Sequence, residues 1–397
     1  MLKRVALPSC LKDFACIGAD CSFTCCQGWR IDIDDATAKK YKKCKDKEWA
    51  DLFKENLNPP TSKKEQYTIK LTEKGYCPFL TETGLCGVQK KFGGSFLGIV
   101  CNAFPRYYNY LPKNKMEKGL YLACPEVVRL VLLAEEKMSF IEVEEKIDIA
   151  KSLINASFYK GHKYTSSFYN LRNFSINILQ DKHYSLQDKL IILAYFFDNF
   201  SNENSEIDAN EMIKSFEELV ATGMVNEFIK QISPDKKYYF SFLKDLLTKI
   251  YSYTTQKKFH EYAEEIYSAL GLHYEKEDVF FNLYDEYYRL FLQKNSLVLE
   301  NYLVYAIFSN IFPLRSKNMW DDFVILVLRY VIANFFLFGV TVKGKGILNE
   351  DELIKCFVIL SKVFDSSVPP TFAEVILEEM KEKNENNILN IFKLIKV

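Results

Sequence analysis

The sequence lacks the motifs that most often announce a nucleotide or zinc site. Its 397 residues contain no G-x-G-x-x-G and no G-x-x-x-x-G-K-[ST] motif, and no two cysteines are separated by two residues. The first two absences argue against a Rossmann-type dinucleotide site and a phosphate-binding P-loop. The third removes the usual signature of a zinc finger or ribbon. All four histidines follow residue 161, so a metal site earlier in the chain would be built from cysteine.

Net charge and a secretory signal are also missing. The 52 Lys and Arg side chains equal the 52 Asp and Glu side chains in number. The chain as a whole therefore has no electrostatic attraction to nucleic acid or to a membrane. The N-terminal MLKRVALPSC has no continuous apolar stretch between its basic start and a cleavage site. We therefore expect a cytoplasmic protein with no nucleic-acid partner.

One apolar run, residues 323–340, approaches the length of a membrane span. It carries Arg329 and Asn334 near its middle, where a charged side chain is costly in lipid. We expect this run to form a buried helix. Peripheral association with a membrane is compatible with the sequence.

Cysteine is abundant, and nearly all of it lies at one end of the chain. Ten of the eleven cysteines precede residue 125, and Cys356 alone lies in the remainder. Residues 1–124 are also basic, with 21 Lys and Arg against 13 Asp and Glu, whereas the remainder has 31 against 39. This change in composition predicts two domains: a cysteine-rich metal or iron–sulfur domain, residues 1–125, and a second domain, residues 126–397.

The spacing of these cysteines favours a metal site over disulfides. Without a signal peptide, the reducing cytosol favours thiolates bound to metal. The first group, Cys16-x4-Cys21-x3-Cys25-Cys26, is compact enough for one loop to direct several sulfurs inward, and the later cysteines come from separate loops. Adjacent Cys25 and Cys26 cannot easily bind one tetrahedral ion, but two irons of a cluster could use both. Spacing alone leaves an iron–sulfur cluster, zinc and free structural thiols as alternatives.

Four segments, in this order and at these separations, resemble the flagellin lysine-N-methylase family. They are FACIGADCSFTCCQGW, CPFLTETGLCGVQ, CNAFPR and ACPE. That family is in turn similar to small cysteine-rich proteins described as zinc- or iron-chelating. The resemblance covers residues 14–126, and beyond Glu126 only chain length and a helical, aromatic-rich character are similar.

The resemblance implies a cytoplasmic enzyme that transfers a methyl group from S-adenosylmethionine to lysine side chains of flagellin. It also implies a [4Fe–4S] cluster, or alternatively zinc, held by the cysteine motifs. The candidate ligands carried over by motif are Cys16, Cys21, Cys25, Cys26, Cys77, Cys86, Cys101 and Cys124. Because one cubane cluster needs four ligands, the others are structural or form a second site. Our first choices are Cys21, Cys25, Cys26 and Cys101, while Cys10 and Cys44 fall outside the motifs.

The residues that would carry out the transfer are not evident from the sequence. Methyl transfer to lysine needs the neutral amine, whereas a free lysine, with a pKa of about 10.4, is charged at pH 7. Asp32 and Asp34 follow the first cysteine loop and could accept the proton, but the alternation in WRIDID favours exposed strand positions for both. Aromatic clusters such as NLYDEYYRLF and ENYLVYAIF could hold a lysine ammonium, although core packing is the favoured interpretation. Catalytic and donor-binding residues therefore stay unassigned.

Two functions without catalysis remain open beside the methylase. The first is a non-enzymatic metal-binding adaptor whose helical domain binds a protein partner. The second is metal storage or delivery. Radical enzymes that use S-adenosylmethionine carry C-x3-C-x2-C, which this chain lacks, so a radical mechanism is disfavoured.

Local patterns predict a mostly α protein, in which a small cysteine-rich α+β metal-binding domain precedes a larger all-α helical domain. Short strands are expected at WRIDID, at residues 67–71 and at the pair around YYNYL and GLYLAC. Helical periodicity begins after Pro125. Capping signals predict helix starts at Ser233, Asn349 and Thr371.

Overall fold

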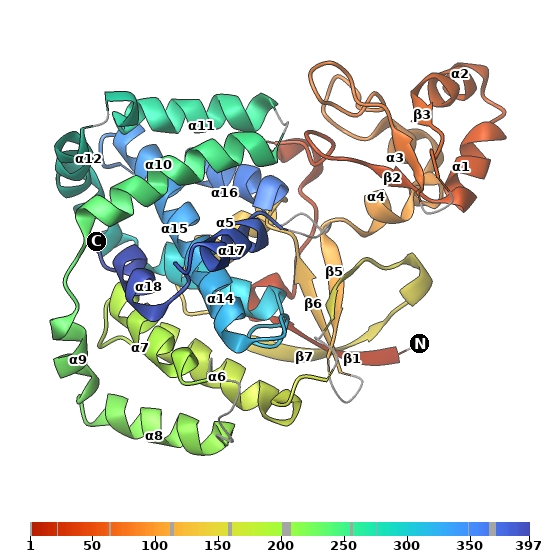
Figure 1. The fold of residues 1–397 in the computed structure, drawn as a ribbon. Coiled ribbons are helices and arrows are strands. Elements are labelled where there is room, and N and C mark those ends of the chain that lie inside the picture. The colour runs from red at the N-terminus through yellow and green to blue at the C-terminus, as the bar shows by residue number, and fades with distance from the viewer. Residues whose placement is uncertain are drawn as a thin grey trace.

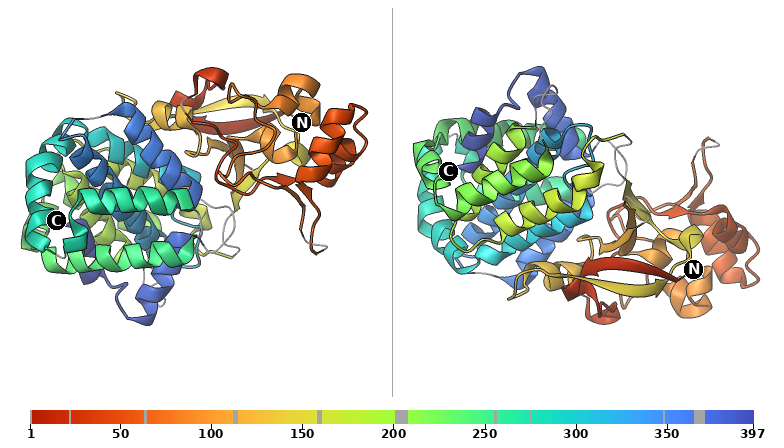
Figure 2. Two further views of the ribbon diagram at one scale, coloured as in Figure 1. Left: turned by 90° about the horizontal axis from the view of Figure 1, so that it is seen from above. Right: turned by 90° about the horizontal axis from the view of Figure 1, so that it is seen from below.

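The protein has two lobes and a sheet that adjoins both (Figures 1 and 2). The computed structural model describes residues 2–397 except 22, 63–64, 112–114, 158–160, 201–207, 255–256, 275, 348 and 365–370. Residues 12–104 form the cysteine lobe, and the helices from residue 125 onward form the helical lobe. The sheet combines the first strand of the chain with strands that follow the cysteine lobe.

The sheet has five strands in the order β7-β1-β6-β5-β8. Its strands are β1 (Leu2–Pro8), β5 (Arg106–Tyr110), β6 (Met116–Leu120), β7 (Phe140–Lys146) and β8 (Ile154–Ser157). Strand β1 pairs antiparallel with β7 along its whole length and parallel with β6. Strands β5 and β6 pair antiparallel, which confirms the two strands predicted around YYNYL and GLYLAC.

Strands β7 and β8 correct one expectation. The sequence predicts only helices in residues 126–397, but both strands lie there and join a sheet whose other strands end before residue 121. The segment FIEVEEK of β7 alternates in the manner of a half-buried strand, and its partner β1 is more than 130 residues earlier in the chain. The expectation of a mostly α protein is confirmed. Among the described residues, however, the purely helical region begins at residue 168 and not at residue 126.

The cysteine lobe consists of short elements around a small core. Its elements are β2 (Asp32–Ile33), α1 (Asp35–Lys42), α2 (Lys47–Asn56), β3 (Leu57–Asn58), β4 (Tyr67–Ile69), α3 (Gly87–Phe92) and α4 (Ile99–Ala103). The strands form an antiparallel sheet in the order β2-β4-β3. Strands β2 and β4 lie where WRIDID and residues 67–71 predict strands, whereas β3 was not predicted. The rings of Tyr41 and Phe53 stack 3.9 Å apart at its centre, and Phe79 meets them edge-on.

The helical lobe packs around one long helix, α15. Its helices are α5 (Pro125–Leu132), α6 (Phe168–Leu179), α7 (Leu186–Asp198), α8 (Ala209–Ala221), α9 (Val225–Gln231), α10 (Lys236–Tyr253), α11 (Lys257–Ala269), α12 (Glu277–Leu283), α13 (Arg289–Lys294), α14 (Ser296–Ser309), α15 (Met319–Lys343), α16 (Glu350–Phe364), α17 (Phe372–Glu382) and α18 (Ile388–Ile395). A π-helical turn, Tyr284–Tyr288, joins α12 to α13. Helix α15 packs against α7, α11, α14, α16, α17 and α18.

Helix α15 contains the apolar run of residues 323–340 and confirms the prediction of a buried helix. Among the described residues, it is the one helix that is long and apolar enough to cross a membrane by length and composition. The most apolar 18-residue stretch of this helix is 94% buried by the rest of the protein. A helix that is apolar on all sides is expected in such a position, because every face meets another helix.

Two of the three predicted helix starts are confirmed. Thr371 and Glu374 form a reciprocal capping box at α17, and the Asn349 side chain accepts a hydrogen bond from the Glu352 N–H at α16. The prediction at Ser233 is wrong, because α10 begins two residues later with Asp235 as its N-cap. The Asp235 carboxylate accepts from the Tyr238 N–H and so replaces the expected serine hydroxyl.

Buried polar contacts join the sheet to the helical lobe. Arg172 of α6 forms an ion pair with Glu117 of β6, and both side chains are almost fully buried. The Tyr305 hydroxyl of α14 accepts a hydrogen bond from the Leu120 N–H at 2.8 Å and donates to the Leu120 carbonyl. The Asn109 amide donates to the Ser309 carbonyl at the end of α14. These paired groups fix the sheet against α6 and α14 because breaking one pair would leave its partner buried without a bond.

Candidate functional site at the junction of the lobes

The predicted ligands divide between the two cores. Cys26, Cys77, Cys86 and Cys101 lie in or against the core of the cysteine lobe, together with Cys44. Cys124, at the start of α5, packs against the core of the helical lobe, as does Cys10. Cys16 and Cys25 are exposed, and Cys21 is half-buried. The eight candidates therefore lie on both sides of the junction between the lobes.

Short backbone pairings bring distant cysteine segments together in the cysteine lobe. The Cys77 N–H donates to the Cys26 carbonyl at 2.8 Å, and Gln27 and Tyr76 form a β-bridge beside this bond. Cys86 is the N-cap of α3, and Cys101 lies inside α4. Cys86 and Cys101 thus lie in the same small lobe as Cys26 and Cys77.

Electrostatic effects show which thiols are neighbours. Burial, with a smaller contribution from nearby thiols such as Cys25 and Cys86, raises the pKa of Cys77 to about 11 and that of Cys101 to about 12. Burial also raises the pKa of Cys124 to about 12, with Cys21 and Cys25 contributing. Because such effects fall off over short distances, Cys25 lies within reach of thiols on both sides of the junction.

Cys25 differs from the other thiols. A hydrogen bond from the adjacent Cys26 thiol, whose sulfur is 3.9 Å away, lowers the pKa of Cys25 to about 7, and the Lys362 ammonium of α16 adds to this effect. Lys362 also donates to the Gln27 carbonyl at 2.9 Å, so α16 is attached to the cysteine loop. The Trp29 indole donates to the Cys25 carbonyl at 2.6 Å. The lowered pKa favours the thiolate form of Cys25, which is the form that binds metal.

The donor chemistry of these residues fits a thiolate-ligated centre. Five of the predicted ligands, Cys25, Cys26, Cys77, Cys86 and Cys101, influence one another electrostatically, and thiolate sulfur is the ligand of iron–sulfur clusters and of many structural zinc sites. In the described part of the chain, however, no three Cys, His, Asp or Glu side chains are arranged closely enough to hold a metal ion. The ligand set therefore stays a prediction.

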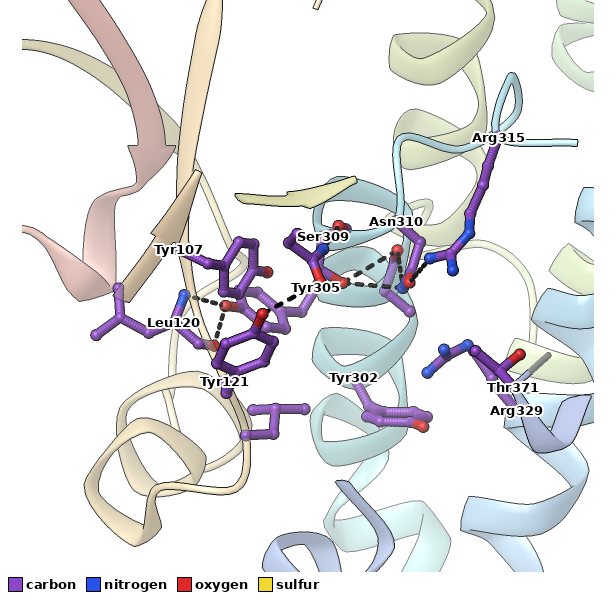
Figure 3. Close-up of a pocket in the computed structure, with 13 residues that line it drawn as sticks. Tyr107, Leu120, Tyr121, Tyr302, Tyr305, Ser309, Asn310, Arg315, Arg329 and Thr371 are labelled. Carbon is purple, nitrogen blue, oxygen red and sulfur yellow. Dashed lines mark hydrogen bonds between the residues drawn. The ribbon is translucent and has the colours of Figure 1, made fainter. Parts of the chain in front are cut away.

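A cavity lies beside this cysteine region, between the sheet and the helical lobe (Figure 3). It encloses about 80 Å³ and is lined by Tyr107, Leu120, Tyr121, Leu122, Asn155, Tyr302, Tyr305, Ala306, Ser309, Asn310, Arg315, Arg329 and Thr371. A smaller cavity of about 20 Å³ adjoins it and shares Arg315, Arg329 and Thr371. Tyrosines of the sheet and α14 occupy one side, and Figure 3 shows the two arginines entering from the other.

Hydrogen bonds hold the polar side of the cavity in place. The Arg315 guanidinium donates to the Asn310 side-chain carbonyl at 3.0 Å and lies 3.6 Å from Glu374. The buried Asp322 carboxylate accepts from the Arg315 N–H at 2.8 Å and from the Ser316 N–H. Burial in this position raises the pKa of Asp322 to about 6. The loop that carries Arg315 is therefore anchored to α15 through Asp322.

A series of aromatic rings connects the cavity with the cysteine region. Tyr107 and Tyr121 lie 4.5 Å apart by ring centroid, Tyr121 and Phe104 are 6.5 Å apart, and Phe104 and Trp29 are 5.4 Å apart. Trp29 is the residue bonded to the Cys25 carbonyl. Tyr121 and Cys124 lie on the same short turn before α5. The cavity and the thiols of the junction are thus parts of one region.

A comparison with protein families identifies the helical lobe. Residues 172–394, more than half of the chain, match the model of the FliB lysine N-methylase C-terminal domain. The chain belongs to the FliB lysine N-methylase family. The match includes α14, α15 and the loop between them, which form the helical wall of the cavity.

Relatives from Salmonella agree with this assignment. The chain is 28% identical over 241 residues to the lysine-N-methylases of Salmonella choleraesuis and Salmonella typhimurium, which covers 59% of this chain and 58% of each relative. It is 34% identical over 166 residues to the flagellar biosynthetic protein FliU of Salmonella muenchen, covering 41% of this chain and 96% of that protein. The chain thus matches little more than half the length of the two lysine-N-methylases. No solved structure matches it.

The family that the cysteine motifs of residues 14–126 resemble is therefore confirmed. The family model matches a different part of the chain, residues 172–394. The relation to zinc- or iron-chelating proteins stays a prediction. Of the two carboxylates considered for proton transfer, Asp34 is the N-cap of α1 and bonds to Thr37 and to the Ile99 N–H, and Asp32 pairs with Arg30. Neither lines the cavity among its described residues.

Sequence reasoning did not select the residues that line the cavity. Tyr302 and Tyr305 belong to the aromatic cluster ENYLVYAIF, and their burial agrees with the favoured core interpretation, although both also face the cavity. Arg329 was visible as a charge inside an apolar run, which is a signal for a polar site within a core. Arg315 has no comparable signal, because its loop becomes part of the site only through the packing of α14 and α15.

Proposed function

We propose that the protein is an S-adenosylmethionine-dependent protein-lysine N-methyltransferase that acts on flagellin in the cytoplasm. The observation that carries this proposal is the match of residues 172–394 to the lysine N-methylase domain, because the same residues form the helical wall of the cavity. The names of the Salmonella relatives, two lysine-N-methylases and a flagellar biosynthetic protein, support the reaction and the substrate.

The lining of the cavity suits an acceptor lysine. Tyrosine rings such as Tyr121 and Tyr302 offer faces that attract an alkylammonium group. The acceptor ammonium first loses a proton to water or to a nearby base. Its nitrogen then forms the new C–N bond as the S–CH3 bond of the donor breaks, and S-adenosylhomocysteine leaves with the electron pair of that bond.

The same proposal includes a [4Fe–4S] cluster held by four of the eight cysteines, with zinc as the alternative metal. When bound, such a cluster supplies a redox-active centre anchored by thiolates. The chain contributes the ionisable Cys25 thiol and the cationic Lys362 beside it. Trp29 and Phe104 place this region next to Tyr121 of the cavity.

The test begins with protein purified without oxygen. Iron, acid-labile sulfide and zinc are measured per chain, and the same sample is incubated with flagellin and S-adenosylmethionine carrying a deuterated methyl group. We expect about four irons with matching sulfide, and labelled methyl-lysine in flagellin peptides by mass spectrometry. Absence of label in the metal-loaded protein would overturn the enzymatic proposal. Stoichiometric zinc without sulfide would replace the cluster and, if label is also absent, favour the non-enzymatic adaptor.

A further inference from the structure

The two edges of the five-stranded sheet differ in charge. Strand β7 forms one edge and β8 the other, because the strand order is β7-β1-β6-β5-β8. The β7 sequence FIEVEEK carries three glutamates and a lysine, and charged side chains on an edge strand oppose pairing with a further chain. The β8 sequence INAS carries no charge. Of the two edges, β8 is therefore the one that lacks this protection.

The pairing of β8 with β5 shows which backbone groups face outward. Ile154 lies opposite Tyr108 in the parallel pair, and the Leu153 carbonyl accepts from the Tyr108 N–H at 2.8 Å. In a parallel ladder, one residue of a pair bonds to the two residues that flank its partner, so the partner's own N–H and C=O point away. The Ile154 N–H and C=O therefore face the outer edge, where no described residue bonds to them.

Strand β8 also forms part of the wall of the larger cavity, through Asn155. The Asn155 amide donates to the Ser309 carbonyl at 3.0 Å, and its side-chain oxygen accepts from the Tyr121 hydroxyl at 3.4 Å. Successive side chains of a strand point to opposite faces, so Ile154 points away from the cavity, and it is 42% exposed. The uncharged edge is thus continuous with the candidate site and is fixed against α14.

We propose that the outer edge of β8 pairs with an extended, lysine-bearing segment of the protein substrate, and that the lysine enters the cavity beside Asn155. This inference rests on the proposed function. A further strand would lie about 4.8 Å from β8, with every second side chain on the same face as Asn155. Lysine carries its nitrogen on a flexible four-carbon stem, which is long enough to span the width of one strand.

This mode of binding defines the class of substrate. In strand addition, main-chain hydrogen bonds supply the affinity and a pocket selects the side chain, so the sequence around the lysine can vary. The segment must be extended when it binds, so the substrate is an unfolded or locally unfolded chain. Because β8 spans only Ile154–Ser157, a short segment is enough to pair with it.

The first test measures binding of a fluorescently labelled flagellin peptide with one central lysine to the metal-loaded protein, by fluorescence polarisation. Two further versions of the peptide carry N-methyl groups on alternate backbone nitrogens, one on the odd and one on the even positions. Only one set of nitrogens can face β8. We expect one version to bind at least about tenfold more weakly than the unmodified peptide, and the other to bind within about threefold of it. Methyl-lysine formation on the peptides should follow the same order.

The second test changes the edge itself. Ile154→Pro removes the outward N–H and leaves the groups that face β5, and proline is tolerated on edge strands. We expect it to weaken peptide binding about 3- to 10-fold, the effect of one lost hydrogen bond. Ile149→Pro is the matched control, because Ile149 is an exposed isoleucine that begins a short helical turn outside β8. Binding in this control should stay within about twofold of wild type.

The outcomes separate this inference from the proposed function. Equal binding of the two methylated peptides would overturn it, as would equal binding by Ile154→Pro and Ile149→Pro. Methyl-lysine on folded flagellin but on no peptide would overturn it too and would leave the methyltransferase standing. If wild type labels neither flagellin nor peptide, the proposed function fails and the inference falls with it. Should Ile154→Pro not fold, as judged by circular dichroism, the two methylated peptides with wild-type protein decide the matter.

Discussion

The two lobes of this protein differ in what can hold them folded. The core of the cysteine lobe contains nine buried apolar side chains, one of which is Cys77. In the helical lobe, helix α15 alone contributes 16 buried apolar side chains to the core. A core as small as the first rarely stabilises a lobe by itself, and such units usually depend on a metal or on covalent links. The comparison suggests that the helical lobe folds through apolar packing, whereas the cysteine lobe depends on its thiols.

The largest effect should come from removing a predicted ligand that packs against the core of the cysteine lobe. We expect Cys101→Ser to abolish metal incorporation and to remove hydrogen-exchange protection from the cysteine lobe, because metal binding and folding are coupled. The hydrogen-exchange protection of α15 should change little in Cys101→Ser. Cys44→Ser is the matched control, since Cys44 packs against the same core but lies outside the motifs. Full metal content in Cys101→Ser would remove Cys101 from the predicted ligand set.

The second prediction tests whether the sheet folds with the helical lobe. Arg172→Met leaves Glu117 buried and unpaired, so we expect a loss of about 3–5 kcal/mol in the free energy of unfolding, measured with urea. The double variant Arg172→Met/Glu117→Gln should recover much of this loss, because no buried charge is then left over. A loss below about 1 kcal/mol in the single variant would show that the sheet is not fixed through this pair.

The pH dependence of the helical lobe should reflect Asp322. Burial raises the pKa of Asp322 from 3.8 to about 6. Between these values the folded protein binds more protons than the unfolded chain, so the contribution of this group to stability is greatest below about pH 4 and is lost as the pH rises through 6. The change is at most about 3 kcal/mol. In Asp322→Asn this part of the slope should be absent, and an unchanged slope would show that Asp322 does not titrate there.

A smaller effect is expected at the hydrogen bonds between α14 and the sheet. Tyr305→Phe removes the hydroxyl that bonds to both backbone groups of Leu120, so we expect a loss of about 1–3 kcal/mol in urea unfolding. Tyr195→Phe, at an exposed tyrosine of α7, serves as the control and should stay within about 0.5 kcal/mol of wild type. Equal losses in both variants would argue against a special role for the Leu120 contact.

The smallest effect should appear at the contact between α16 and the cysteine loop. Lys362→Met removes the bond to the Gln27 carbonyl, which should cost about 0.5–1.5 kcal/mol. It also removes a cation that lowers the pKa of Cys25, so this pKa should rise above about 7. The pH dependence of Cys25 alkylation in metal-free protein measures this change. Lys355→Met, on the same helix and paired with Glu352, should leave it unaltered.

The two lobes also differed in how far the sequence could predict them. Alternation located β4, β5 and β6, and the apolar run of residues 323–340 identified the buried α15, because these patterns are set by local burial. Strand β7 was missed because residues 126–397 were expected to be helical, and its pairing with β1 joins segments more than 130 residues apart. The helix start at Asp235 was missed because Ser233 and Asp235 are both competent caps, and packing selects between them.

The sequence by itself determined the family, through cysteine motifs whose order is a property of the chain, and it determined which segments are apolar enough to be helical core. Tertiary structure alone decided which thiols lie on each side of the junction and that Cys25 interacts electrostatically with thiols of both groups. It also decided that Tyr121, Tyr302, Arg315 and Arg329, spread over about 200 residues, line one cavity. The physical reason is that local patterns record whether a side chain is buried, whereas the neighbours it meets depend on how the lobes pack.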